Sequence, residues 1–242
     1  MAERGEGCAQ GDQIEEADPQ THGEFAGRIN RLANALFDRG IRRQDRVAIL
    51  AQNCPQYIEV YGAGEVAGYI TAAVNFRLAA PEIAYILKDN LPEVLIFESQ
   101  YIEIVASLRD NLSKPEKYIC IGHSPDWAEN YESVLLSGSS EAPPIRARED
   151  DTAYLIYTSG TTGRPKGAML GQRGQLAFAN QVAMDNGIQA DDVMFLVMPF
   201  YHIGAKCNQI GCAYRGASFV LHRDYDPSAI VQAFEKYRVT LA

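Results

Sequence analysis

The sequence lacks the features that mark membrane, secreted and zinc-binding proteins. No apolar run approaches the length of a transmembrane helix, and the N-terminal stretch M-A-E-R-G-E-G-C-A-Q-G-D-Q has no apolar core of the kind found in signal peptides. The five cysteines include no C-x-x-C pair, and the four histidines are scattered along the chain. We therefore expect a cytoplasmic protein with reduced thiols and without a histidine–cysteine zinc site.

Positive charge is also scarce. The chain has 22 Lys and Arg residues against 31 Asp and Glu residues, which gives a net charge of −9 at pH 7. Nucleic acids and anionic membranes attract positive surfaces, so this balance argues, though weakly, against either as the main partner. With 242 residues, of which 47% are hydrophobic and 22% charged, the chain can bury one large core or two small ones.

Short apolar runs alternate with amphipathic segments from about residue 21 onward, whereas residues 1–20 are polar, aperiodic and expected to be a disordered leader. Strands are expected at 46–51, 70–74, 94–98, 118–122, 153–158, 168–170 and 193–197. Helices are expected at 21–36, 55–68, 81–87, 100–112, 172–186 and 227–237. This alternation predicts an α/β fold with a largely parallel sheet, a subdomain boundary at 137–151 and a second α/β pattern from Ile203.

The sequence ends on a strand-like segment, Val239–Ala242, which follows the last expected helix. A strand with an unpaired edge is a poor end for a domain and favours self-association. We therefore expect the 242 residues to be a piece of a longer protein.

The stretch Y-T-S-G-T-T-G-R-P-K-G, residues 157–167, combines hydroxyl side chains, glycines and one lysine. Glycines let backbone N–H groups turn toward a ligand, hydroxyls add hydrogen-bond donors, and Lys166 adds a mobile positive charge. Such a loop suits a polyanion, for which a nucleoside triphosphate is our expectation. It is not a Walker loop, because Gly167 follows Lys166 where that motif has Ser or Thr. On composition alone, a flexible surface hairpin explains the stretch equally well.

The order of these residues closely resembles the phosphate loop of the adenylate-forming, or AMP-binding, superfamily, which includes acyl- and aryl-CoA synthetases. M-P-F-Y-H-I-G, residues 198–204, resembles the next motif of that family. Similar segments upstream are R-I-N-R-L-A-N-A-L (28–36), D-R-V-A-I-L (45–50), N-F-R-L (75–78) and A-Y-I-L-K-D (84–89). The resemblance runs from about residue 21 to 242 and implies layered sheets flanked by helices, as in the large N-terminal domain of these enzymes, with the C-terminal lid domain absent.

The resemblance also implies roles for individual residues. The residues expected to hold the phosphates of ATP, with Mg²⁺, are Thr158, Ser159, Gly160, Thr161, Thr162, Gly163 and Lys166. His202 matches a family residue near the substrate carboxylate and is the expected catalytic residue. The residues expected to contact the acid are Tyr201, His202, Ile203, Gly204 and Ala205. Which residue meets the metal is left open. The resemblance also implies that Ala205, Lys206 and Gln209 lie along the acyl tunnel, but a charge is unusual there, and exposure to solvent is the alternative for Lys206.

The activity implied for the full-length parent joins a fatty or aromatic carboxylic acid to CoA through an acyl-adenylate. The alternatives are an adenylation domain that loads a carrier protein, and a truncated, non-catalytic nucleotide-binding protein. Because the family's adenine- and ribose-binding segments and its C-terminal lysine would lie beyond Ala242, this chain alone is expected to be inactive. The acidic runs 149–151 and 191–192 are expected to be solvated, and a homodimer is a further expectation.

Overall fold

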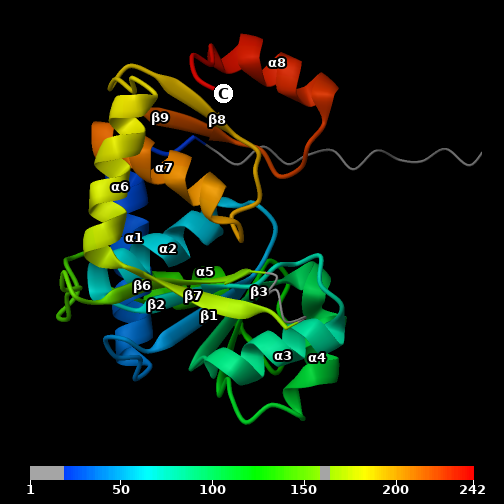
Figure 1. The fold of residues 1–242 in the computed structure, drawn as a ribbon. Helices are drawn as coiled ribbons and strands as arrows, with labels where there is room; N and C mark the ends of the chain where they lie inside the picture. Colours follow the sequence, from blue (N-terminus) through cyan, green and yellow to red (C-terminus); the bar gives the residue numbers. More distant parts are fainter. Residues whose placement is uncertain (1–18, 159–163) are drawn as a thin grey trace, which may run out of the picture.

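The computed structural model describes residues 19–158 and 164–242. Its elements, in chain order, are α1 (His22–Asp38), β1 (Arg46–Leu50), α2 (Pro55–Ala67), β2 (Ile70–Ala73), α3 (Ala80–Asn90), β3 (Val94–Glu98), η1 (Ser99–Tyr101), α4 (Ile102–Arg109), β4 (Lys117–Ile121), β5 (Glu129–Asn130), α5 (Tyr131–Ser137), β6 (Thr152–Thr158), β7 (Lys166–Gly171), α6 (Gln172–Asp185), β8 (Val193–Leu196), α7 (Ile203–Arg215), β9 (Ser218–Leu221) and α8 (Pro227–Tyr237). Figure 1 shows these elements arranged around two sheets.

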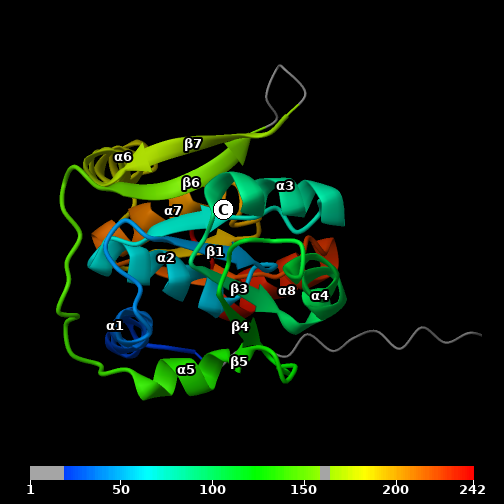
Figure 2. The same cartoon turned by 90° about the horizontal axis from the view of Figure 1, so that it is seen from below.

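The larger sheet has seven strands in the order β5-β4-β3-β1-β2-β6-β7. Its neighbours pair in parallel, except that β7 runs antiparallel to β6. Every residue of β2 and β3 is buried, as expected for parallel strands with helices on both faces. Residues of α1, α2 and α5 pack on one face, and residues of α3 and α4 pack on the other (Figure 2). The α/β fold with helix-flanked sheets is confirmed.

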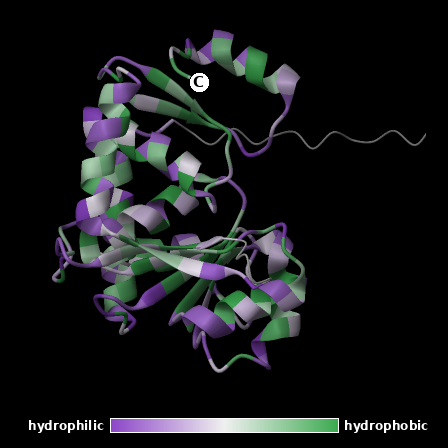
Figure 3. Cartoon of the chain, viewed as in Figure 1, coloured by the Kyte–Doolittle hydropathy of each residue, from purple (hydrophilic) through white to green (hydrophobic). Residues whose placement is uncertain are grey.

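The smaller sheet pairs β8 with β9 in parallel, from Val193↔Ser218 to Leu196↔Leu221. In Figure 1, α7 lies between this sheet and α2. One hydrophobic core cluster contains residues of α1 and α2 as well as residues of α7, β8 and β9, and Figure 3 shows the apolar colouring that runs through both layers. The two sheets are therefore packed as one body.

The expected subdomain boundary at 137–151 is wrong. After this loop, β6 returns to the larger sheet and pairs with β2, in the register Thr71↔Tyr154. The chain leaves that sheet only after β7, through α6, so the change of layer comes later than the loop composition indicated. A connection rich in Pro and Ser indicates a turn or loop, but it does not indicate which sheet the next strand joins.

Local signals explain where the first helices begin and end. Thr21 caps α1 in a reciprocal pair with Glu24: the Glu24 N–H donates to Thr21 Oγ1 (3.2 Å), and the Thr21 N–H donates to the Glu24 carboxylate (2.8 Å). Pro55 begins α2, where its missing N–H costs no helical hydrogen bond. Gly68 ends α2 with φ +80°, a left-handed conformation that favours glycine.

Some of the expected elements differ from the structure. The short pair β5 and α5 was not expected, and the helix expected at 100–112 is instead η1 followed by α4, which ends at Arg109. The expected strand at 239–242 contributes a single parallel bridge, Met194↔Leu241, beside β8. The leader expected at 1–20 lies almost wholly outside the described residues. Among the described residues, no helix is long and apolar enough to cross a membrane.

Candidate functional site

The β6–β7 hairpin presents the glycine-rich loop at its tip. The two strands are paired up to Tyr157↔Gly167 and Thr158↔Lys166, so Thr158 and Lys166 form the two sides of the loop's base. Both side chains are exposed. Ser159, Gly160, Thr161, Thr162 and Gly163 lie outside the described residues, and their expected roles stay predictions.

Helix α3 braces the base of this hairpin. The Tyr157 hydroxyl donates to the Asp89 carboxylate (2.7 Å), and the Tyr85 hydroxyl reaches the carbonyl oxygen of Pro165 (3.4 Å). A side chain on Gly167 would begin only 3.2 Å from the Tyr157 ring, so glycine allows the two strands to keep this pairing. The residues flanking the loop are thus held by α3 and by the pairing of β6 with β7.

Lys166 supplies an exposed positive charge at the base of the loop. Among residues 19–158 and 164–242, its ammonium group forms no ion pair. An exposed ammonium beside a hydroxyl residue, at the end of a buried strand, suits a phosphate oxygen. The phosphate-binding roles of Thr158 and Lys166 stay predictions.

His202 lies at the N-terminus of α7, where it is the capping residue. The Gly204 N–H donates to His202 Nδ1 at 3.3 Å, so Nδ1 carries no proton in this arrangement. The neutral ring therefore carries its proton on Nε2 and can donate it to an acceptor. The side chain is exposed, and the partial positive charge of the helix N-terminus favours an anionic group nearby.

The neighbours of His202 are less exposed. Tyr201 is half-buried and places its ring edge-on against Phe76, with 5.4 Å between the ring centroids. Ile203 and Gly204 are also half-buried, whereas Ala205 is fully buried and contacts core rather than solvent. The Cys207 thiol on the same helix has its pKa raised by burial, so it remains neutral at neutral pH.

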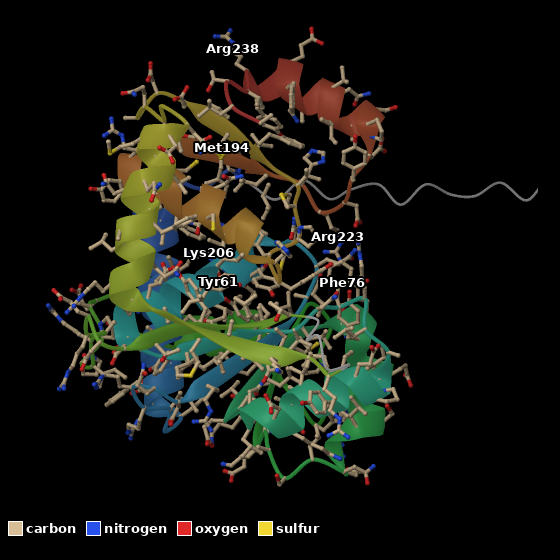
Figure 4. The ribbon with its side chains drawn as sticks, viewed as in Figure 1. Tyr61, Phe76, Met194, Lys206, Arg223 and Arg238 are labelled. Atoms are coloured by element: carbon tan, nitrogen blue, oxygen red, sulfur yellow. The ribbon has the colours of Figure 1, made fainter. Side chains whose placement is uncertain are left out.

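Of the two alternatives for Lys206, exposure to solvent is wrong. Its side chain is 1% exposed, and its ammonium lies 2.6 Å from Glu65 Oε1 and donates to Gln209 Oε1 at 2.6 Å. The same nitrogen lies 5.0 Å above the Tyr61 ring and 5.7 Å from the centre of the Tyr154 ring (Figure 4). A carboxylate, an amide and two ring faces replace the water that the charge loses on burial.

One residue of the two acidic runs, Asp151, is buried. Asp151 was expected to be solvated, but it is 3% exposed and pairs with Arg43 at 3.2 Å. Its second oxygen accepts a hydrogen bond from the Arg148 N–H (2.8 Å), so this carboxylate fixes the turn before β6. No group of three or more His, Cys, Asp or Glu side chains in the described parts of the chain could hold a metal ion.

The sheet brings the hairpin and the His202 segment to one edge. Strands β2 and β6 are parallel, with Ala73 opposite Ile156, so Thr158 at the carboxyl end of β6 and Phe76 just beyond that of β2 lie at the same edge of the sheet. Tyr201 contacts Phe76 at that edge. In open parallel sheets, ligands bind at the carboxyl ends of the strands. A shallow depression against α1, lined by Pro19, Gln20, Glu24, Gly27, Arg28, Arg31 and Ser140, contains none of these residues.

The sequence matches the model of a known protein family over nearly its whole length. The family described as AMP-binding enzyme matches residues 9–242. The chain belongs to this family. The resemblance of its glycine-rich loop and of its P-F-Y-H segment is therefore part of a match along almost the whole AMP-binding chain.

Relatives of this chain include CoA ligases. A 3-methylmercaptopropionyl-CoA ligase of Ruegeria lacuscaerulensis is 32% identical over 230 residues, which cover 91% of this chain and 43% of that protein. A feruloyl-CoA synthase of an Amycolatopsis species is 34% identical over 227 residues, covering 91% of this chain and 42% of that protein. The crystal structure of an anthranilate CoA ligase in complex with anthranoyl-AMP has a TM-score of 0.84 at 25% identity and covers 90% of this chain and 43% of its own. The chain thus spans less than half the length of each of these three proteins.

Proposed function

We propose that the protein activates a carboxylic acid with ATP and then transfers the acyl group to CoA. The observation that carries the proposal is that Thr158, Lys166 and the His202 segment meet at one edge of the sheet in a chain of the AMP-binding family. The substrates are MgATP, CoA and a fatty or aromatic acid. Relatives named for feruloyl-CoA and a related structure that holds anthranoyl-AMP support an aromatic acid and an adenylate intermediate.

The first half-reaction is a nucleotidyl transfer. A carboxylate oxygen of the acid attacks the α-phosphorus of ATP, the bond to the bridging oxygen breaks, and pyrophosphate leaves. Thr158, Lys166 and the loop residues Ser159–Gly163 hold the β- and γ-phosphates, and Lys166 neutralises the charge that builds up on the leaving pyrophosphate. In the second half-reaction the CoA thiol, losing its proton, attacks the acyl carbonyl and AMP leaves.

His202 has the geometry of a donor to the acid. Because Nδ1 is occupied by the Gly204 N–H, the ring's orientation is fixed and Nε2–H is the atom offered to a ligand. A hydrogen bond from Nε2 to one carboxylate oxygen would leave the other oxygen free to attack phosphorus. Tyr201, Ile203 and Gly204 are the half-buried neighbours that we assign to the acid's binding surface.

Acid-dependent exchange of labelled pyrophosphate into ATP tests this function directly. The complete gene product that contains these residues should exchange label only when a suitable acid is present, and it should form a thioester when CoA is added. Exchange followed by transfer to a carrier-protein thiol in place of CoA would support the adenylation-domain alternative. Nucleotide binding without exchange for any fatty or aromatic acid would support the non-catalytic alternative. A cytoplasmic location and a homodimer stay predictions.

Replacing His202 with alanine should mainly impair use of the acid. Loss of a hydrogen bond to a carboxylate costs about 1.5–3 kcal/mol, so kcat/KM for the acid should fall by roughly ten- to a hundredfold while the KM for ATP changes little. Steady-state kinetics with each substrate varied in turn provide the measurement.

Two further variants make this result specific. His202→Asn keeps a side-chain acceptor for the α7 cap, so recovery of acid use by asparagine would mean that only the cap matters. His123→Ala removes an exposed histidine after β4 and should leave both kinetic constants unchanged.

A further inference from the structure

Phe200, two residues before His202, has both its peptide N–H and its carbonyl oxygen held by side chains from the region of α2. The Phe200 N–H donates to Asn53 Oδ1 at 3.0 Å, and the Tyr61 hydroxyl donates to the Phe200 carbonyl oxygen at 2.9 Å. Phe200 lies inside the turn that ends at His202, because the His202 N–H donates to the Pro199 carbonyl oxygen at 3.0 Å. The backbone that carries His202 is therefore tied to α2 rather than to its own strand alone.

The side-chain amide of Asn53 acts as acceptor and donor at once. Its Nδ2 group donates to the carbonyl oxygens of Val197 (3.3 Å), Met198 (3.0 Å) and His222 (3.0 Å). The residue is 4% exposed, so these backbone groups have little access to water. One side chain at the carboxyl end of β1 thus fixes the chain as it leaves both β8 and β9.

A second anchor lies on the other side of His202. Lys206, one turn further along α7, pairs with Glu65 of α2 at 2.6 Å. Glu65 also accepts a hydrogen bond from the Tyr154 hydroxyl, and Tyr154 belongs to β6, the strand that leads into the hairpin loop. The segment with His202 at its centre is therefore held at Phe200 before it and at Lys206 after it.

Tyr61 and Glu65 are four residues apart on α2, so they share the face of the helix that meets this segment. Burial holds the pKa of the Tyr61 hydroxyl well above its ordinary range, so the group stays protonated at neutral pH and can donate. Phe200 itself packs against Tyr57 and Tyr61, with 5.9 and 6.4 Å between ring centroids. Phe200 is thus held by hydrogen bonds to its backbone and by packing of its ring.

We infer that Asn53, Tyr61 and Glu65 are positioning residues that set the place of the His202 ring for the acid. The inference rests on the proposed function, since it is the acid that requires a fixed ring. Displacement of a catalytic group by about 1 Å can cost roughly a hundredfold in rate, which gives such a clamp a purpose beyond stability. None of the three acts on the substrate directly; each acts through the backbone or helix that carries His202.

Matched variants separate this role from a purely structural one. The Asn34 side-chain amide donates hydrogen bonds to the carbonyl oxygens of Asn30, Ser139 and Glu141 at 2.9–3.0 Å. Asn34 is 8% exposed and lies far from His202. Tyr69 donates a buried hydroxyl to the Ala33 carbonyl at 2.9 Å, as Tyr61 does to Phe200. Asn53→Asp and Asn34→Asp therefore each lose amide hydrogen bonds to three backbone carbonyl oxygens. Tyr61→Phe and Tyr69→Phe each lose one buried hydroxyl hydrogen bond to a backbone carbonyl oxygen.

The first readout is the ring of His202 itself in the 242-residue chain. Its imidazole resonances, assigned by comparison with His202→Asn, should shift in Asn53→Asp and Tyr61→Phe and stay in place in Asn34→Asp and Tyr69→Phe. Tyr61→Phe removes a single hydroxyl and keeps the ring, so it decides the question even if Asn53→Asp fails to fold. Resonances that stay unchanged in Tyr61→Phe, or that shift equally in both tyrosine variants, overturn the inference.

The second readout is kinetic and uses the complete gene product. Asn53→Asp should raise the KM for the acid about tenfold, below the roughly hundredfold cost of a 1 Å displacement, and leave the KM for ATP unchanged. Equal changes in both constants would contradict a role specific to His202. If the unaltered protein shows no acid-dependent exchange, the proposed function fails, and the ring resonances still decide whether the clamp sets the position of His202.

Discussion

Replacing Lys166 with alanine is expected to slow acyl-adenylate formation by roughly 10²–10³-fold, the usual cost of removing one preorganised charge contact to a transition state. The ammonium group stands at the base of the loop, exposed, opposite Thr158. It would meet phosphate charge only while pyrophosphate is still attached or leaving. Thioester formation from supplied acyl-adenylate and CoA should therefore be nearly unaffected. Single-turnover measurements of each half-reaction in the complete gene product check the expectation.

Two variants sharpen the interpretation of this result. Lys166→Arg keeps the charge but exchanges a compact ammonium for a planar fork, so it should recover only part of the lost rate. Lys88→Ala removes another exposed lysine from α3 and should change neither half-reaction. Equal losses in both half-reactions of Lys166→Ala would contradict a role limited to the phosphates.

Much of the larger sheet could be predicted because its signals are local. The apolar runs of β1, β3 and β6 are bounded by turn residues, and each forms a strand within one residue of the expected limits. The short elements β5 and α5 have no such signal. Helix α5 has only seven residues, and its burial depends on distant partners, including the hydrogen bond from the Tyr131 hydroxyl to Glu59 of α2 (2.7 Å). A helix this short is stabilised by packing more than by its own sequence.

The candidate site was inferred from the order of residues in two segments, 157–167 and 198–204, and the roles of these residues stay predictions. What sequence reasoning missed are the side chains whose partners are distant along the chain. Asn53 stands just before the helix expected at 55–68, yet Cys54 is the capping residue, and Asn53 instead holds the chain around 197–200. A polar residue before a proline carries a local signal for a helix start, which hides any tertiary role.

Lys206 is the most instructive of these residues. A lone lysine in the first turns of a helix is most simply interpreted as exposed, because burial of a charge is costly without a partner. Its partner, Glu65, lies on α2, in a stretch whose sequence shows no matching signal. The sheet order brings α2 and α7 together, so the pair is a consequence of topology rather than of sequence spacing.

Replacing Lys206 with methionine should lower the free energy of unfolding by about 3 kcal/mol, the lower end of the range for breaking a buried ion pair. Methionine fills similar space, so the loss comes from the Glu65 carboxylate and the Gln209 amide that the ammonium no longer meets. The Glu65 side chain is 27% exposed, and water that reaches it limits the cost. Urea unfolding followed by circular dichroism provides the measurement.

The reason for this loss can be tested by neutralising the remaining charge. Adding Glu65→Gln to Lys206→Met should recover more than half of the lost stability, because the amide oxygen still accepts from the Tyr154 hydroxyl and no charge stays unpaired. Lys114→Met breaks a comparable contact to Glu93 on the surface, at 2.5 Å, and should change stability little. A double variant as unstable as Lys206→Met would mean that packing around α7, and not the unpaired carboxylate, determines the cost. The His202 ring resonances of the double variant provide a second comparison. If its stability recovers but these resonances still differ from those of the unaltered protein, the Lys206–Glu65 pair also positions the helix that carries His202.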